Sequence, residues 1–285
     1  MSSLPIKKIY CDTKFKRYDS RSTSDFKIDL PQTIKLPENC VCYIDDVSIP
    51  RTYYTVETGI NDKLYFRLSD HSYVPPEAFY IDHILTLDSK DYTGVQFAAE
   101  VQNKIAANAS GEVATCSYDS RTRMMSVSVA NLDIQVFTDE ELKDPQNNIG
   151  WVGISYDPKK LSCGNELLTN VFRNVVGSSA LTTVAKYYLN LTPVRNIYMK
   201  SPNLSNFNTM GADGSVSIIK KIPVNVPAGE MITSFITSST DFIPCNNLTL
   251  KTIEIQLQDV NGNIIPLHGA NMSFSILFDI MNSDQ

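Results

Sequence analysis

Two runs in the C-terminal third of the sequence alternate regularly between apolar and polar residues. They span residues 252–258 and 272–280. Alternation with a period of two predicts β-strands that bury one face. Leu248 and Leu250 are out of phase with the first run by one residue, which predicts a bulge near residues 251–252.

The polar stretch between these runs predicts a tight turn. Residues 259–263 read D-V-N-G-N, and Asn261-Gly262 supplies the positive φ that a hairpin turn needs. We therefore expect the two runs to form a C-terminal hairpin. We also expect its strands to pair with strands from residues 1–50, so that both ends of the chain build one sandwich.

The first part of the chain also has the pattern of strands. We expect them at residues 6–15, 26–30 and 40–49. The last of these is the most apolar, and it should stop at Pro50 because proline cannot donate to a β-ladder. Pro31 and Pro37 are expected to bracket a turn.

The pattern changes after Pro50, and a helix is predicted at residues 94–108. Thr93 is a good N-cap, and Gln96 completes a capping box. Tyr92 and Phe97 are placed as a hydrophobic staple.

Strands are expected around this helix at 63–68, 79–87, 114–118, 124–129 and 132–137. Strands, helix and hairpin in this order predict a compact α+β unit.

Residues 139–185 show no sustained period, although 161–172 could hold a short helix. Strands are then expected again at 187–191, 196–200, 216–223 and 231–236. The predicted fold is mainly β: a single jelly-roll β-sandwich, from residues 1–50 and 186–285, with an inserted α+β domain at 51–185. Three expected strands before the insertion and about six after it suit a two-sheet sandwich.

Composition narrows the function classes. The chain of 285 residues has a net charge of −6, which does not favour specific nucleic-acid binding. No run approaches the roughly 18 apolar residues of a membrane span, and we expect no membrane insertion. The six cysteines form no C-x-x-C pair, so we interpret them as reduced thiols. Only three histidines are present, and we expect no metal and no cofactor.

A search for catalytic groups returns weak candidates, and we predict that the protein is not an enzyme. Asp45 and Asp46 are adjacent, but neighbours in a strand should face opposite sides of the sheet. Residues 259–263 could bind calcium, although the hairpin interpretation is favoured because no downstream glutamate completes the loop. His268 could serve as a general base or as an ordinary surface residue.

Several residues could instead contact another protein. Lys7-Lys8 and Lys220-Lys221 are basic pairs at strand ends, which could touch a partner or simply face water. Trp151, the only tryptophan, could anchor an interface or pack in a core. Arg51, Tyr53 and Tyr54 follow a strand directly, which suits either a subunit contact or packing at a domain edge.

Several segments together resemble the minor capsid proteins of virophages and Polinton-like viruses. They are residues 40–54 (C-V-C-Y-I-D-D-V-S-I-P-R-T-Y-Y), 194–201 with Leu204, 217–224 and 250–278. The resemblance implies a penton protein, a single jelly roll that forms homopentamers at the fivefold vertices of an icosahedral capsid. Its partners would be itself and the major capsid protein. It would be located in the virion, after synthesis in the cytoplasm of the host or in a giant-virus factory.

Under this hypothesis we expect three contact elements. They are the corner with Arg51, Tyr53 and Tyr54, the loop 201–215 with Asn203, Asn206 and Phe207, and the N-terminal segment with Lys7 and Lys8.

Two alternatives stay open at this point. The inserted domain could bind a glycan or a host receptor as an attachment module, through aromatic residues such as Tyr73, Phe79 and Tyr80. An enzyme on a jelly-roll scaffold is the third hypothesis. A cupin needs clustered histidines, which the chain lacks, and a glycosidase needs two facing carboxylates.

Overall fold

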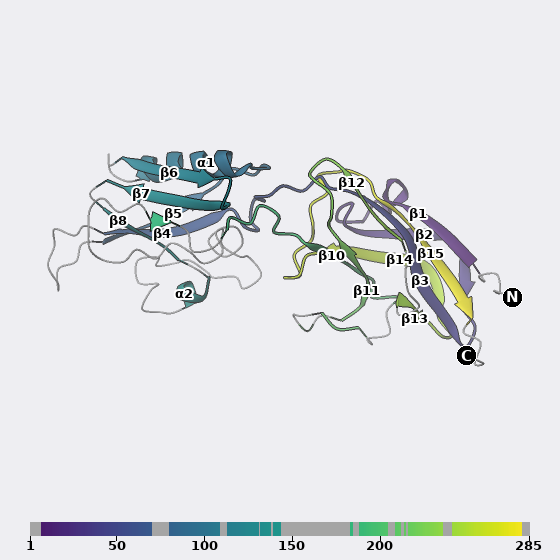
Figure 1. Cartoon of the computed structure of the whole chain (residues 1–285). Helices are drawn as coiled ribbons and strands as arrows, with labels where there is room; N and C mark the ends of the chain where they lie inside the picture. The colour runs from purple at the N-terminus through teal and green to yellow at the C-terminus, as the bar shows by residue number, and fades with distance from the viewer. Residues whose placement is uncertain are drawn as a thin grey trace. The chain divides into compact units, whose positions relative to one another are not determined.

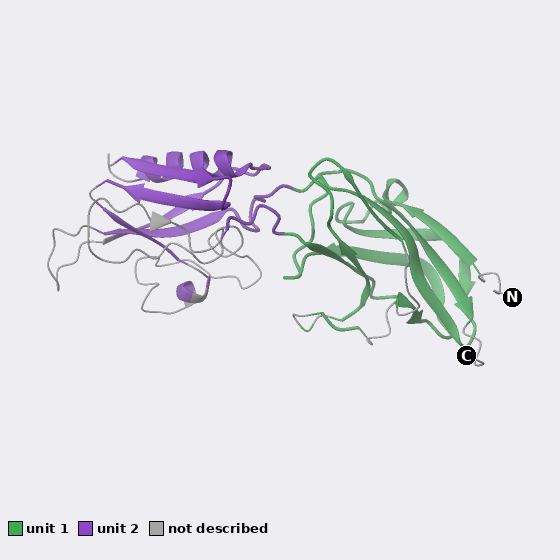
Figure 2. Cartoon of the chain, in the orientation of Figure 1, with its two compact units in different colours: residues 1–53, 194–285 green, residues 54–193 purple. Residues whose placement is uncertain are grey.

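The computed structural model describes residues 7–69, 80–108, 113–130, 132–137, 139–143, 183–184, 188–204, 209–211, 214, 216–235 and 241–280. The chain divides into two compact units (Figure 2). Unit 1 comprises Met1–Tyr53 and Val194–Gln285, and unit 2 comprises Tyr54–Pro193. The domain boundaries expected from the sequence, after residues 50 and 185, stay a prediction.

Unit 1 contains two antiparallel sheets among its described residues (Figure 1). The first has the order β1 (Lys7–Asp12), β15 (Ser273–Ile280), β3 (Cys40–Pro50) and β12 (Met231–Phe235), and the short β13 (Ile243–Pro244) also pairs with β3. The second has the order β11 (Ile218–Pro223), β10 (Asn196–Lys200), β14 (Thr249–Gln258) and β2 (Asp25–Lys35). A 3₁₀ turn, η1 (Thr13–Phe15), follows β1 where the sequence predicted continued strand.

The strand order in unit 1 is that of a jelly roll. When its eight long strands are numbered along unit 1 alone, the sheets have the orders 1-8-3-6 and 5-4-7-2. This arrangement is the double Greek key of an eight-stranded jelly roll. β14 pairs with β2, and β15 lies between β1 and β3. The prediction that the C-terminal strands pair with residues 1–50 is therefore confirmed.

The core of unit 1 lies between the two sheets. Phe26 on β2 and Phe274 on β15 are almost fully buried, and their ring centroids are 6.2 Å apart. Alternate residues of β14 and β15 supply much of the rest, as the period-two pattern predicted. The burial of apolar surface is the main stabilising contribution in such a sandwich, and it is worth about 25 cal/mol for each Å² buried.

Two local features near β2 can be compared with expectation. The bulge predicted near residues 251–252 is confirmed, because the register of β14 against β2 shifts between Leu250 and Thr252. The turn expected at Pro31 is wrong, because β2 continues through Pro31 to Lys35. β2 is an edge strand, and Pro31 lies opposite the bulge, so its missing N–H costs no ladder hydrogen bond.

The expected C-terminal hairpin is also wrong. The turn exists, since the Asp259 N–H donates to the Asn263 carbonyl at 2.9 Å and Gly262 has φ of 85°. However, β14 already has β10 on one side and β2 on the other, so no side is left for β15. The chain instead crosses to the other sheet after a single bridge between Gln258 and Ile264.

Unit 2 combines two three-stranded sheets with a helix. One sheet has the order β5 (Tyr80–Thr86), β4 (Lys63–Ser69) and β8 (Asp133–Val136), and the other has β6 (Ala114–Asp119), β7 (Met124–Val129) and β9 (Thr183–Val184). Two helices, α1 (Gly94–Asn108) and the short α2 (Asp139–Lys143), are described. Residues 188–191 form no strand, contrary to prediction, and the possible helix at 161–172 lies outside the described residues.

The start of α1 follows the sequence signals closely. The Thr93 N–H donates to the Gln96 side chain at 3.0 Å, and the Gln96 N–H donates to the Thr93 hydroxyl at 3.3 Å. The rings of Tyr92 and Phe97 meet edge to face with centroids 5.6 Å apart. The predicted capping box and hydrophobic staple are both confirmed.

Candidate assembly surface

A β-bulge in β3 shapes the outer face of the first sheet. Ser275 pairs with Asp46 while Ile276 pairs with Ile44, so Asp45 is the extra residue. The Ser275 hydroxyl donates to the Asp46 carboxylate and lies 3.5 Å from Oδ2 of Asp45. Both carboxylates therefore lie on one face. The expectation that they face opposite sides is wrong because the bulge interrupts the alternation.

Two lysines compensate the negative charge at this bulge. Nζ of Lys8 lies 2.5 Å from Oδ2 of Asp45, and this hydrogen bond raises the pKa of Lys8. Lys220, buried on β11, donates to the Ile44 carbonyl at 2.9 Å, and burial lowers the pKa of its ammonium. Ile44 lies in the gap between the segments of β3 that β12 and β13 pair with. Because no described strand pairs with Ile44 on that side, the Lys220 ammonium takes the place of a backbone N–H as donor to the Ile44 carbonyl.

Four residues form a row across the outer face of this sheet, which we call the outer row. The register aligns Tyr10, Ser275, Asp46 and Phe235 on neighbouring strands. Residues paired in this way lie on the same side of a sheet. Ile9 and Cys11, which flank Tyr10, pack with the core, so the row faces outward. Tyr10 is 77% exposed and Phe235 is 67% exposed.

The outer row was not predicted from the sequence. Tyr10 and Phe235 each occupy a position of an alternating strand that normally faces water. An aromatic residue at such a position is the sequence feature that could have indicated an exposed contact surface. Aromatic side chains are enriched where one protein surface covers another. Lys8 lies over the Tyr10 ring at 5.1 Å from its centroid, which holds a positive charge beside the apolar surface.

The predicted corner after β3 is mostly internal. The Arg51 side chain is buried, with Nη1 donating to the Val226 carbonyl at 2.6 Å. Tyr53 is buried in the core of unit 1. Tyr54 is 37% exposed and begins unit 2. A subunit contact through these residues stays a prediction, and Tyr54 is the one that reaches the surface.

The other predicted contact residues are placed as follows. Asn203 is partly buried and joins β10 to β14, because its Nδ2 donates to the Thr252 carbonyl at 2.5 Å and its Oδ1 accepts from Ser201. Lys7 and Lys8 lie on β1, an edge strand. Tyr80 is the first residue of β5. Asn206, Phe207, Tyr73, Phe79 and Trp151 lie outside the described residues.

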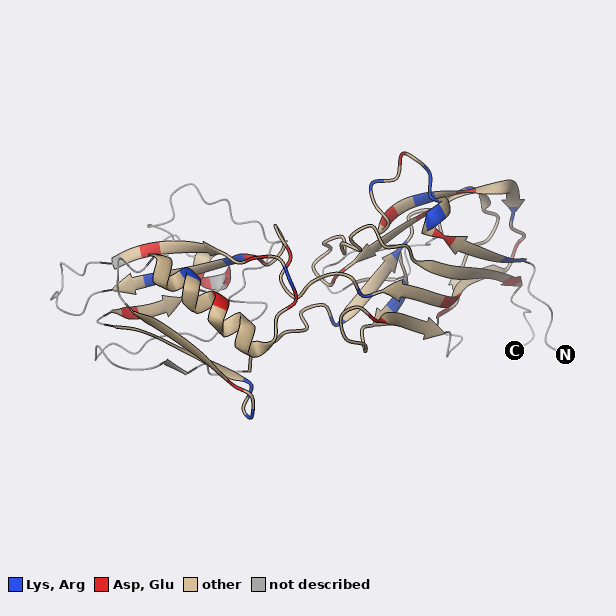
Figure 3. Ribbon diagram, turned by 90° about the horizontal axis from the view of Figure 1, so that it is seen from above, with Lys and Arg blue, Asp and Glu red and all other residues tan. Residues whose placement is uncertain are grey.

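Side chains of the types that bind metals do not cluster in the part of the chain that the structure describes. No group of three or more His, Cys, Asp or Glu side chains there could hold a metal ion. The five described cysteines are free thiols, and four of them are buried. No described helix is long and apolar enough to cross a membrane. Figure 3 shows basic and acidic residues interspersed along both units.

Comparison with known proteins gives a match among solved structures only. No protein-family model and no curated protein sequence matches the chain. The crystal structure of the mavirus penton protein matches over 96% of this chain and 100% of that chain, with a TM-score of 0.49 and 11% identity. The name of that protein, a penton, is the one that the sequence resemblance also led us to expect.

Proposed function

We propose that this protein is a viral capsid protein, the penton that forms the fivefold vertex of an icosahedral virion. The observation that carries the proposal is the jelly-roll strand order of unit 1. Jelly rolls build capsids, but the same fold also serves lectins and cupins. The segments that resemble virophage minor capsid proteins favour the capsid use. Two of them contain β3 and β11, and a third runs from β14 into β15.

Assembly of a ring of five requires two different surfaces on each copy. A heterologous interface of this kind closes only when the rotation between neighbours fits the number of copies. The outer row offers one such surface, because its exposed aromatics are the type of side chain that anchors interfaces. Neighbouring copies of this chain would cover it. The major capsid protein would meet the outside of the ring, and the protein would be located in the virion.

Electron microscopy of the purified full chain tests this function directly. We expect class averages with fivefold rotational symmetry. Rings with another symmetry would overturn the penton assignment, although they would leave a role in assembly. Single particles without rings, at all concentrations up to the solubility limit, would argue against any capsid role.

A further inference from the structure

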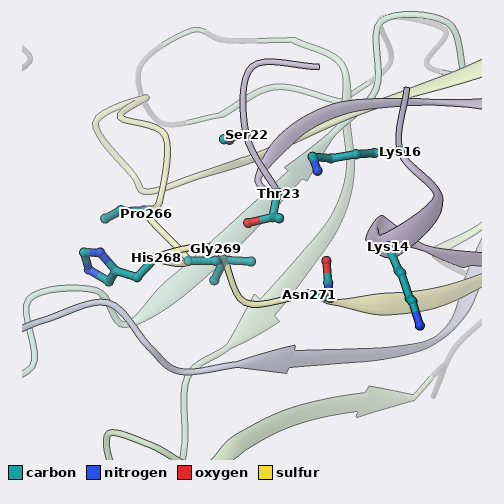
Figure 4. Close-up of a pocket in the computed structure, with 9 residues that line it drawn as sticks. Lys14, Lys16, Ser22, Thr23, Pro266, His268, Gly269 and Asn271 are labelled. Atoms are coloured by element: carbon teal, nitrogen blue, oxygen red, sulfur yellow. The ribbon is translucent and has the colours of Figure 1, made fainter. Parts of the chain in front are cut away.

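Two loops of unit 1 enclose a hollow of about 640 Å³ (Figure 4). One loop joins β1 to β2 and contributes Lys14, Lys16, Ser22 and Thr23 to its lining. The other joins β14 to β15 and contributes His268 and Asn271. A volume of this size lies within the range of small-ligand sites, roughly 300–1,000 Å³.

The two loops are fixed to each other, so the hollow is pre-formed. The fully buried Thr13 donates its N–H to the Met272 carbonyl at 3.0 Å. Its hydroxyl donates to Oδ1 of Asn271 at 3.1 Å and accepts from the Met272 N–H at 3.0 Å. Thr52 adds a hydrogen bond to the Leu267 carbonyl at 2.8 Å. A site that is already ordered costs little conformational entropy to fill.

The hollow carries uncompensated positive charge. Its lining includes Lys14 and Lys16 and contains no carboxylate. Carboxylates of this loop and of the start of β2 pair with arginines instead: Arg17 pairs with Asp19 and Asp29, and Arg21 pairs with Asp25. Asp12 accepts from the backbone N–H of Lys14. Neither lysine ammonium pairs with a carboxylate anywhere in the described ranges.

The side chain of Thr23 also faces this space. Thr23 is only 8% exposed and lines the hollow, and its hydroxyl has no hydrogen-bond partner among the residues described. Figure 4 shows Lys16 reaching toward Thr23, while Lys14 lies at the rim with its ammonium pointing away.

The opposite wall is a strained turn. His268 and Gly269 have φ of 48° and 82°, and the Ala270 N–H donates to the Leu267 carbonyl at 2.8 Å, which defines a type I′ turn. A positive φ is uncommon for a residue with a side chain, although histidine tolerates it better than most. The turn holds the imidazole at the far side of the hollow from Lys16 (Figure 4).

We propose that this hollow binds an anionic saccharide, with Lys16 as the main contact to the charged group. Lys16 would hold the sulfate, phosphate or carboxylate. Thr23, Ser22 and Asn271 would exchange hydrogen bonds with the sugar hydroxyls. An acidic peptide is less favoured, because the lining comes from two loops and offers no sheet edge for a peptide backbone. This inference does not depend on the penton proposal.

Calorimetric titration of the full chain tests the site. The ligands are glucose 6-sulfate, glucose 6-phosphate and glucuronate, with neutral glucose, inorganic phosphate and a hexaglutamate peptide as comparisons. We expect at least one anionic sugar to bind more tightly than both glucose and phosphate, and its binding to weaken with added salt. The sugar that binds most tightly identifies which charged group the site takes.

Variants then locate the binding. Lys16→Gln should weaken binding about tenfold or more, which corresponds to losing one charge-assisted hydrogen bond. Thr23→Val, which keeps the shape, should also weaken it. Lys221→Gln removes an exposed lysine of β11 outside the hollow and should leave binding unchanged. If Lys16→Gln binds as well as the unchanged protein, the site is not this hollow.

Four results would overturn the proposal. They are an absence of binding by all three anionic sugars, equal binding of glucose, equal binding of free phosphate, and preferential binding of hexaglutamate. The penton proposal would survive each of them, since it is tested by symmetry and mass.

Discussion

At the scale of single residues, Arg51 shows how a residue predicted at an interface can serve the fold. Its guanidinium reaches from the end of β3 to the Val226 carbonyl, and its backbone pairs with Gly229 and Glu230. It thereby ties β3 to the loop that precedes β12. A buried, hydrogen-bonded charge of this kind is costly to remove because its acceptor loses a partner.

We therefore predict that Arg51→Met destabilises unit 1 by about 1–3 kcal/mol. Hydrogen exchange measured by mass spectrometry should show faster exchange in residues 224–230. The control is Lys221→Met, at an exposed position shortly before residues 224–230 in the sequence. This variant should exchange as the unchanged protein does. Unaltered exchange in the Arg51 variant would show that the guanidinium does not stabilise the contact between β3 and the loop before β12.

Cys11 gives a prediction about pH. It is buried in the core of unit 1, and burial raises the pKa of its thiol from about 9 to about 12. Between these values the unfolded chain loses the proton while the folded chain keeps it. Stability is therefore full below pH 9 and falls as the pH rises toward 12, by about 1.4 kcal/mol per pH unit at most.

The Cys11→Ala variant isolates this effect. Its free energy of unfolding should fall less steeply between pH 9 and 11 than that of the unchanged protein, because the other titrating groups are common to both. Urea unfolding at a series of pH values measures the difference. Parallel curves would mean that the Cys11 thiol ionises normally in the folded state.

At the scale of elements, local signals were sufficient for the helix and most strands. The boundaries of α1 match the prediction because a capping box and a staple act within a few residues. The alternation of apolar and polar residues in β14 and β15 can likewise be recognised from the sequence of each strand alone. Pairing between strands is different, because it depends on which edges are already occupied. That is why the expected C-terminal hairpin failed.

The candidate surface could not be predicted for a similar reason. The outer row joins four strands that are far apart in sequence, and only the register aligns them. The bulge at Asp45 was hidden as well, since Cys40, Val41 and Cys42 at the start of β3 are all buried. A strand that is apolar on both faces gives no alternation from which a shifted register could be recognised.

The position of β15 leads to a prediction about truncation. β15 lies between β1 and β3 and brings Phe274, Ile276 and Phe278 to the core. Removing residues 272–285 should therefore unfold unit 1 while α1 in unit 2 keeps its protection. Hydrogen exchange of the truncated chain measures both units at once. Retained protection in β2 and β14 would contradict the jelly-roll account of unit 1.

At the scale of the whole molecule, our proposal assigns assembly to the outer row. Replacing both Tyr10 and Phe235 by serine removes its exposed aromatics without touching the core. We expect this double variant to remain folded by circular dichroism and to lose most of its higher oligomers in analytical ultracentrifugation. The matched control is Tyr18→Ser, since Tyr18 is 98% exposed on the loop after β1. Equal oligomerisation of the double variant would place the subunit contact elsewhere.

Native mass spectrometry of the purified full chain tests the central claim most directly. The penton account predicts a dominant species of five times the 31.8 kDa of one chain, and closed rings of this kind should not grow further. A protein that stays monomeric at high concentration, or that forms a closed assembly with another number of copies, would contradict it.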